Sequence, residues 1–71
     1  MQLVPVQSSN LAAVGYEPMT YLLEIQFRNG TAYQYFNVPS AVHQGLMEAQ
    51  SKGQYFDHFV KKPGYAFKQV R

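Results

Sequence analysis

The sequence predicts a small α+β domain, from a strong β-hairpin signal in the first half of the chain and helical periodicity in the second. Two β-prone runs, residues 21–28 and 31–37, flank the dipeptide Asn29-Gly30. This dipeptide accepts positive φ at both central positions of a type I′ turn, so the two runs should pair as a hairpin. After Pro39 the spacing of apolar residues changes from two to about 3.6, which indicates helix.

The segment before the hairpin is expected to add a third strand. Residues 11–16 are predicted to be extended, and the turn at Glu17-Pro18-Met19 would send the chain back along them, because proline presets φ for a turn. These connections give an antiparallel meander. Residues 3–7 are expected to be an extended edge segment, since Pro5 cannot donate a hydrogen bond within a central strand.

The first helix is predicted over residues 40–50. Val42, Leu46 and Ala49 lie at i, i+4 and i+7, and Pro39 suits a first helical turn because it lacks an N–H that would go unpaired there. Gly45 costs this helix about 1 kcal/mol relative to alanine. Either packing demands a small residue at that position or the helix is marginal.

A second, shorter helix is expected to begin after Ser51, whose hydroxyl can cap it. Phe56, Phe59 and Val60 then form an i, i+3, i+4 apolar patch. Residues 61–64, with their Pro-Gly pair, should end this helix.

The final segment, residues 65–71, alternates in part, which fits both a last strand and a frayed terminus. The predicted architecture is therefore a three-stranded antiparallel meander packed on one face by two short helices, with a C-terminal strand left open.

Length and composition fit a single domain spanning residues 1–71, since a chain this short holds only one core. The apolar fraction of 46% and aromatic fraction of 15% are typical of a folded chain. Without cysteine, the core must be held by packing, to which six tyrosines and five phenylalanines contribute. No secretory signal or run of about 20 apolar residues is present, so we expect a cytoplasmic protein without a membrane span.

The positive charge is concentrated in the last third of the chain. Up to residue 50 there are one arginine and three acids, a net −2, whereas the remainder has four lysines and one arginine against one acid, a net +4. This asymmetry indicates an anionic partner, although a solvated basic tail explains it equally well. The candidate phosphate contacts are Lys52, Lys61, Lys62, Lys68 and Arg71.

The faces of the predicted hairpin decide where its tyrosines point. With a two-residue loop, Ile25 and Phe27 share the face that the helices cover, while Tyr33 and Tyr35 lie on the opposite face. Exposed tyrosines on a sheet can stack on bases of single-stranded nucleic acid, at about 1 to 3 kcal/mol per base. A one-residue bulge at the turn would reverse the parity and place both tyrosines beside Ile25. Terminal segments covering them would also remove such a platform.

An ordered set of motifs covers nearly the whole chain: Ser8-Ser9-Asn10, Val14-Gly15-Tyr16, Leu23, Ile25, Phe27, Gly30, Tyr33-Gln34-Tyr35, Val38-Pro39, Leu46, Ala49, Ser51, Gly53 and Tyr55-Phe56. This order resembles the KTSC domain, a short module found alone in bacterial and phage proteins and at the C-terminus of some lysyl-tRNA synthetases. The resemblance implies a family without an established activity, and its attachment to a tRNA-charging enzyme favours RNA binding. Tyr33 and Tyr35 match its central Tyr-x-Tyr motif. Asp57 departs from the asparagine expected there, and is predicted to cap or turn the second helix in either case.

The residues argue against an enzyme. His43 and His58 are distant in sequence, no cysteine accompanies them, and neither belongs to the apolar stripes, so we expect exposed histidines and no metal site. Asp57 and His58 are sequence neighbours that point about 100° apart on a helix, which disfavours a catalytic triad. No glycine-rich phosphate loop is present, and no cofactor is expected.

Two functional hypotheses follow. The first is a module that binds RNA or single-stranded nucleic acid through Tyr33, Tyr35 and the C-terminal cations. The second is a protein-interaction module, such as a phage or bacterial regulator docking on a large host machine like RNA polymerase, through a sheet edge or residues 2–7. Only the first predicts a steep dependence on salt. The sequence does not define an oligomeric state.

Overall fold

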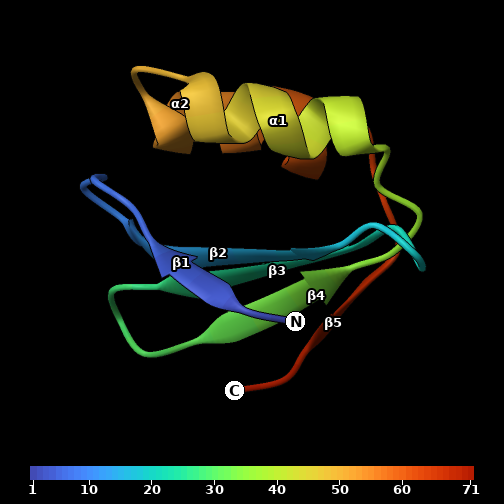
Figure 1. Ribbon diagram of the computed structural model, residues 1–71. Helices are drawn as coiled ribbons and strands as arrows, with labels where there is room; N and C mark the ends of the chain where they lie inside the picture. Colours follow the sequence, from blue (N-terminus) through green and yellow to red (C-terminus); the bar gives the residue numbers. More distant parts are fainter.

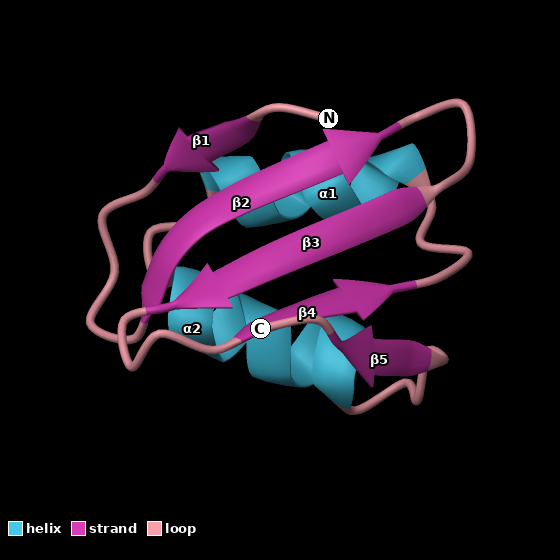
Figure 2. Ribbon diagram, turned by 90° about the horizontal axis from the view of Figure 1, so that it is seen from below, coloured by secondary structure: helices cyan, strands magenta, loops and turns pink.

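A computed structural model describes all residues from Met1 to Arg71. Five strands form one antiparallel sheet in chain order, and the helices all cover the same face of it (Figures 1 and 2). The elements are β1 (Leu3–Pro5), β2 (Leu11–Glu17), β3 (Leu22–Phe27), β4 (Ala32–Tyr35), α1 (Ser40–Glu48), α2 (Lys52–Phe56), a π-helical turn (Asp57–Lys61) and β5 (Phe67–Gln69).

The α+β class and the helix-covered meander are confirmed, whereas the strand number of three is wrong. The expected edge segment is the strand β1, paired with β2 at one side of the sheet. The C-terminal segment is the strand β5, which pairs with β4 at the other side. Both extra strands are edge strands of three residues, held mainly by backbone hydrogen bonds to longer neighbours, so propensity alone identifies them poorly. No helix is both long and apolar enough to cross a membrane.

The turn between β3 and β4 differs from the predicted type I′ turn. Its three-residue loop, residues 28–30, is closed by the N–H of Phe27 donating to the carbonyl of Thr31 at 2.8 Å, and among the loop residues only Gly30 has positive φ, at 95°. The extra loop residue changes the register, so Ile25 pairs with Tyr33 and not with Gln34. The bulged alternative is therefore the one found, and Tyr33 and Tyr35 lie on the helix-covered face.

The first helix is shorter than predicted and ends at Glu48, and Pro39 lies just outside it as the N-cap residue. The ammonium of Lys52 donates to the carbonyls of Met47 and Ala49, at 3.2 and 2.9 Å, which satisfies acceptors at the end of α1. A side chain on Gly45 would collide with the ring of Tyr55 from α2. Packing between the helices therefore demands the small residue.

The second helix begins as predicted, because the Ser51 hydroxyl accepts a hydrogen bond from the N–H of Gln54 at 3.4 Å. It then widens into the π-helical turn, in which the N–H of Lys62 donates to the carbonyl of Asp57, five residues earlier, at 2.9 Å. Gly64, with φ of 84°, follows this segment. The predicted apolar patch is only partly correct, since Phe59 is 53% exposed.

A dry aliphatic core fills part of the space between the sheet and the helices. Its fully buried side chains are Leu11, Val14, Leu23, Ile25, Val38, Leu46 and Val60. Beside it, the hydroxyl of Tyr16 donates to the carbonyl of Val38 at 2.6 Å, and the Tyr16 ring stacks on His43 with centroids 4.6 Å apart. Burial lowers the pKa of His43, which is half-buried and not exposed as predicted, whereas His58 is exposed.

Candidate functional site: an aromatic pocket

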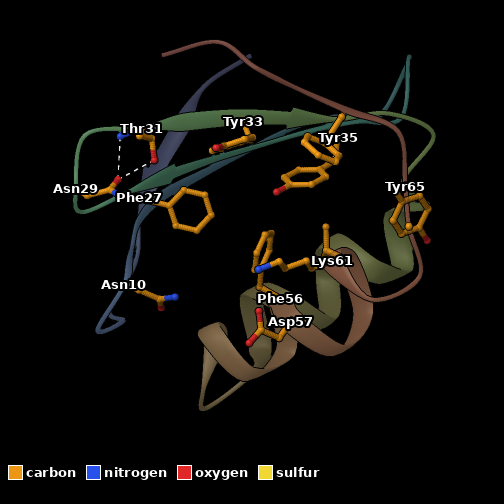
Figure 3. A pocket seen from close by; sticks show the side chains of 13 residues that line it. Asn10, Phe27, Asn29, Thr31, Tyr33, Tyr35, Phe56, Asp57, Lys61 and Tyr65 are labelled. Atoms are coloured by element: carbon orange, nitrogen blue, oxygen red, sulfur yellow. Dashed lines mark hydrogen bonds between the residues drawn. The ribbon is translucent and has the colours of Figure 1, made fainter.

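A pocket of about 500 Å³ opens where β3, β4 and β5 face the π-helical turn (Figure 3). Its walls are largely aromatic, and the rings come from four separate parts of the chain: Phe27, Tyr33, Tyr35, Phe56, Tyr65 and Phe67. Rings from the sheet lie on one side, and Phe56 projects toward them from the helical layer. The pocket is thus a continuation of the core in which aromatic side chains replace aliphatic ones.

The rings hold one another in fixed orientations. Tyr33 and Tyr35 lie at 28° with centroids 6.4 Å apart, and Phe67 from β5 contacts both, at 6.0 and 5.7 Å. Phe56 meets Phe27 and Tyr35 nearly edge-on, at 5.5 and 5.6 Å. Such edge-to-face pairs contribute about 0.5 to 1.5 kcal/mol each beyond their buried area. The aromatic surfaces are therefore largely preformed.

The two tyrosines of the Tyr-x-Tyr motif differ in exposure. Tyr35 is only 6% exposed, and burial, with a smaller effect of the neighbouring Tyr33, raises its pKa to about 12. Tyr33 is half-buried, and its hydroxyl donates to Oε1 of Gln69 at 3.3 Å. The predicted outward-facing platform is therefore wrong, because the three-residue loop turns both rings into the pocket.

Polar groups from loops lie at the hairpin end of the pocket. The Asn29 side-chain oxygen accepts from the N–H and the hydroxyl of Thr31, at 3.0 and 2.7 Å. The Asn10 side-chain oxygen accepts from the Ser8 hydroxyl at 3.1 Å. Within the chain, the amide nitrogens of both asparagines make no hydrogen bond, so both retain free donors at the pocket.

Two charged residues from the π-helical turn, Asp57 and Lys61, line the helical side of the pocket (Figure 3). Asp57 is the C-cap residue of α2, as predicted, and caps it through its backbone N–H, which donates to the carbonyls of Gly53 and Gln54; its side chain makes no capping hydrogen bond. The chain stays helical through this segment, so positions four residues apart share a face. Four of its residues therefore line the pocket: Phe56, Asp57, Val60 and Lys61. The turn thus combines apolar packing with two opposite charges at one site.

The predicted phosphate contacts are dispersed over the molecule. Lys61 lines the pocket, and Lys62 lies beside it, in a shallow hollow also bordered by Asp57 and His58. Lys52 holds the end of α1, as described above. Lys68 pairs with Gln34, whereas its neighbour Phe67 pairs with Tyr35, so Lys68 points to the helix-free face of the sheet.

The last cation, Arg71, belongs to the chain end, which crosses the helix-free side of the sheet (Figure 2). Its carbonyl accepts from the N–H of Ala32 at 2.8 Å. Of the seven residues predicted as a nucleic-acid site, the structure brings three to the pocket, Tyr33, Tyr35 and Lys61, and one more, Lys62, next to it.

Sequence reasoning missed several pocket residues. Phe27 and Phe56 were assigned to the core, which is partly correct, since both contact it as well as the pocket. Asn10 and Asn29 were read only as loop and turn residues. Their free amide groups were not deducible from the sequence, because the pocket forms only when β5 and the π-helical turn close around the hairpin.

Comparison with known proteins places the chain in a family. The KTSC domain model matches residues 7–65. The chain belongs to the KTSC domain family. A crystal structure of a KTSC domain protein from Yersinia pestis is similar to this chain at 44% identity and a TM-score of 0.89, over 99% of this chain and 97% of that one.

Sequence relatives of this KTSC domain are of two kinds. An uncharacterized protein of Stutzerimonas stutzeri is 39% identical over 99% of both chains. A lysine–tRNA ligase of Nostoc sp. is 44% identical over 83% of this chain, but the match covers only 10% of the ligase. A second ligase, from Nostoc punctiforme, is 41% identical over the same shares.

Two of the motifs that carried the family resemblance meet in space. Asn10 of the Ser-Ser-Asn motif packs on Gly53 of α2, where a Cβ would lie 2.7 Å from the asparagine side-chain oxygen. The glycine thus permits the loop of residues 8–10 to approach the helix. In this KTSC domain the contact fixes Asn10 at the edge of the aromatic pocket.

Proposed function

We propose that this KTSC domain binds single-stranded nucleic acid, RNA in particular, by taking one unstacked base into the aromatic pocket. The observation that carries the proposal is a preformed aromatic pocket with a lysine, Lys61, at its rim. Single-stranded RNA is recognised mainly by stacking of splayed bases on aromatic side chains. The earlier idea of an open tyrosine platform is replaced by a pocket that contains the same two tyrosines.

Size and chemistry both suit a base. A volume of about 500 Å³ lies within the usual range for small-ligand pockets, about 300 to 1,000 Å³. Stacking of a base on an aromatic side chain contributes about 1 to 3 kcal/mol. Phe67 offers the most accessible ring at the site, being 60% exposed, and is the natural stacking partner.

The phosphate backbone would be held by Lys61 and Lys62, which are exposed and adjacent in the chain. Their charges require no desolvation in the free protein, so binding would be driven by counterion release and weaken with salt. Two cations and one stacked base support weak binding only. The similarity to parts of lysine–tRNA ligases is in keeping with an RNA partner.

Fluorescence anisotropy with a labelled single-stranded RNA of mixed sequence tests the proposal. We expect saturable binding at tens of micromolar protein, weaker at higher salt, and largely lost in Lys61→Ala/Lys62→Ala. The matched control is Lys68→Ala/Arg71→Ala, which removes the same charge from two residues that do not line the pocket. Absence of binding by the unmodified protein, or equal losses in both double variants, would contradict the proposed site.

Docking of a protein partner by strand addition is the competing hypothesis. The two sheet edges, β1 and β5, are only three residues long, and Pro5 deprives β1 of one donor. These edges are poor templates for a further strand, so the pocket is the better-supported site.

A further inference from the structure

We infer that Asp57 makes the pocket selective for guanine, an inference that rests on the proposed binding of a base. Asp57 lies on the first turn of the π-helical segment, beside Phe56, whose ring forms one wall of the pocket (Figure 3). Its carboxylate accepts no hydrogen bond from the rest of the chain, although Lys61 lines the same pocket. The group is therefore free to bind a ligand that enters.

An aspartate carboxylate has acceptors only, two oxygens side by side. Among the four bases of RNA, guanine alone presents two adjacent N–H donors, N1–H and N2–H, on its Watson–Crick edge. Adenine has one donor and one acceptor there, uracil one donor between two acceptors, and cytosine one donor beside two acceptors. A carboxylate thus forms two parallel hydrogen bonds with guanine, an arrangement that is stronger and more directional than a single bond.

Two asparagines from the loops that border the pocket offer the complementary groups. The free amide nitrogens of Asn10 and Asn29 are donors, because the oxygen of each side chain is already occupied by a neighbouring hydroxyl or N–H. Guanine carries the acceptors O6 and N7 on its remaining edge. The pocket therefore combines an acceptor on the π-helical turn with two donors from the loops, and guanine carries groups complementary to both.

The test uses short oligouridine RNAs that carry one central guanine, hypoxanthine or adenine, measured by fluorescence anisotropy. The unmodified protein should bind the guanine oligomer about tenfold more tightly than the adenine oligomer, in keeping with the discrimination of one bidentate pair. Hypoxanthine lacks the N2 amino group and should fall between them. Equal affinity for the three oligomers would overturn the inference while leaving the proposed function intact, whereas no binding of any would overturn both.

Substitution of Asp57 separates hydrogen bonding from charge. Asp57→Asn keeps the shape but offers one donor and one acceptor, which match adenine, so the preference should shift from guanine to adenine. Glu48→Gln, on α1 at a position that does not line the pocket, removes the same charge and should preserve the preference. Because Asp57 is exposed, thermal unfolding should be nearly unchanged in Asp57→Asn. Retention of guanine preference in a folded Asp57→Asn would contradict the assignment.

Discussion

The space between the sheet and the helices has two contrasting ends. At one, aliphatic side chains from β2, β3 and α1 interdigitate until Leu11, Leu23, Ile25 and Leu46 are wholly inaccessible to solvent. At the other, aromatic rings meet edge-on and leave a pocket of about 500 Å³. Flexible, branched side chains adjust to fill space, whereas rigid rings keep their planes and leave gaps between them. The same sheet thus supplies stability at one end and a preformed cavity at the other.

Because of this difference, neighbouring residues contribute either to stability or to the pocket. Leu23 pairs with Tyr35 across β3 and β4, so the aliphatic core and the pocket wall meet within a single hairpin. We expect changes at the aliphatic end to affect stability first, and changes at the aromatic end to affect binding first. Three measurements test this expectation.

The largest effect is expected from Leu23→Ala at the aliphatic end. Leu23 is completely buried, and removal of its side chain should lower the free energy of unfolding by about 2 to 5 kcal/mol, because transfer and cavity terms add. Urea denaturation followed by circular dichroism measures the loss. The control is Leu22→Ala, which removes the same atoms from the half-buried neighbour on the other face of β3. Equal losses would show that the two faces contribute alike.

An intermediate effect is expected from alkaline pH, through Tyr35. Its pKa is raised to about 12 in the folded chain against 10.0 in the unfolded one, so both states hold the proton below pH 10. Above pH 10 only the unfolded state releases it readily, and stability should fall by about 2 to 3 kcal/mol as the pH approaches 12. Thermal unfolding between pH 9 and pH 12 would follow this loss. Tyr35→Phe should reduce it but not abolish it, because burial also raises the pKa of Tyr16.

The smallest effect on stability is expected at the exposed wall of the pocket. Phe67 is 60% exposed, so Phe67→Ala should lower the free energy of unfolding by less than about 1 kcal/mol. Its effect on RNA affinity should be larger, about fivefold or more, since a stacking surface is lost. Val70→Ala shortens another exposed apolar side chain near β5 that does not line the pocket, and should leave affinity unchanged. A large loss of stability without loss of affinity in Phe67→Ala would contradict the expectation that the aromatic end serves binding more than stability.

The sequence predicted the elements well and their number poorly. The hairpin, the strand before it, both helices and the Ser51 cap are local features, set by turn residues, periodicity and capping chemistry, and all are present. The sequence indicated β1 only as an extended segment. For β5 it left a strand and a frayed terminus as alternatives. Short edge strands depend on a partner and not on their own propensity.

For the candidate site, too, the sequence indicated local features but not how they are arranged in space. Its residue types could be read from the chain: a Tyr-x-Tyr motif, a nearby basic segment, a helix bearing Phe56 and Asp57. Which of these residues come together in space could not be read from the chain. Lys61 lines the pocket while Lys68 points to the other side of the sheet, although the sequence grouped them in one basic segment.

By itself, then, the sequence determined an α+β meander with helices on one face, because these features follow from local patterns of apolar residues and turns. Only the tertiary structure decided on which face of the sheet the tyrosines lie. A single extra residue in the loop before Thr31 shifts the pairing of β3 and β4 by one position, and in a strand that shift moves every side chain to the opposite face. The register therefore places both tyrosines in the pocket and not on an open platform, where Tyr35 packs against Phe56 and both rings contact Phe67.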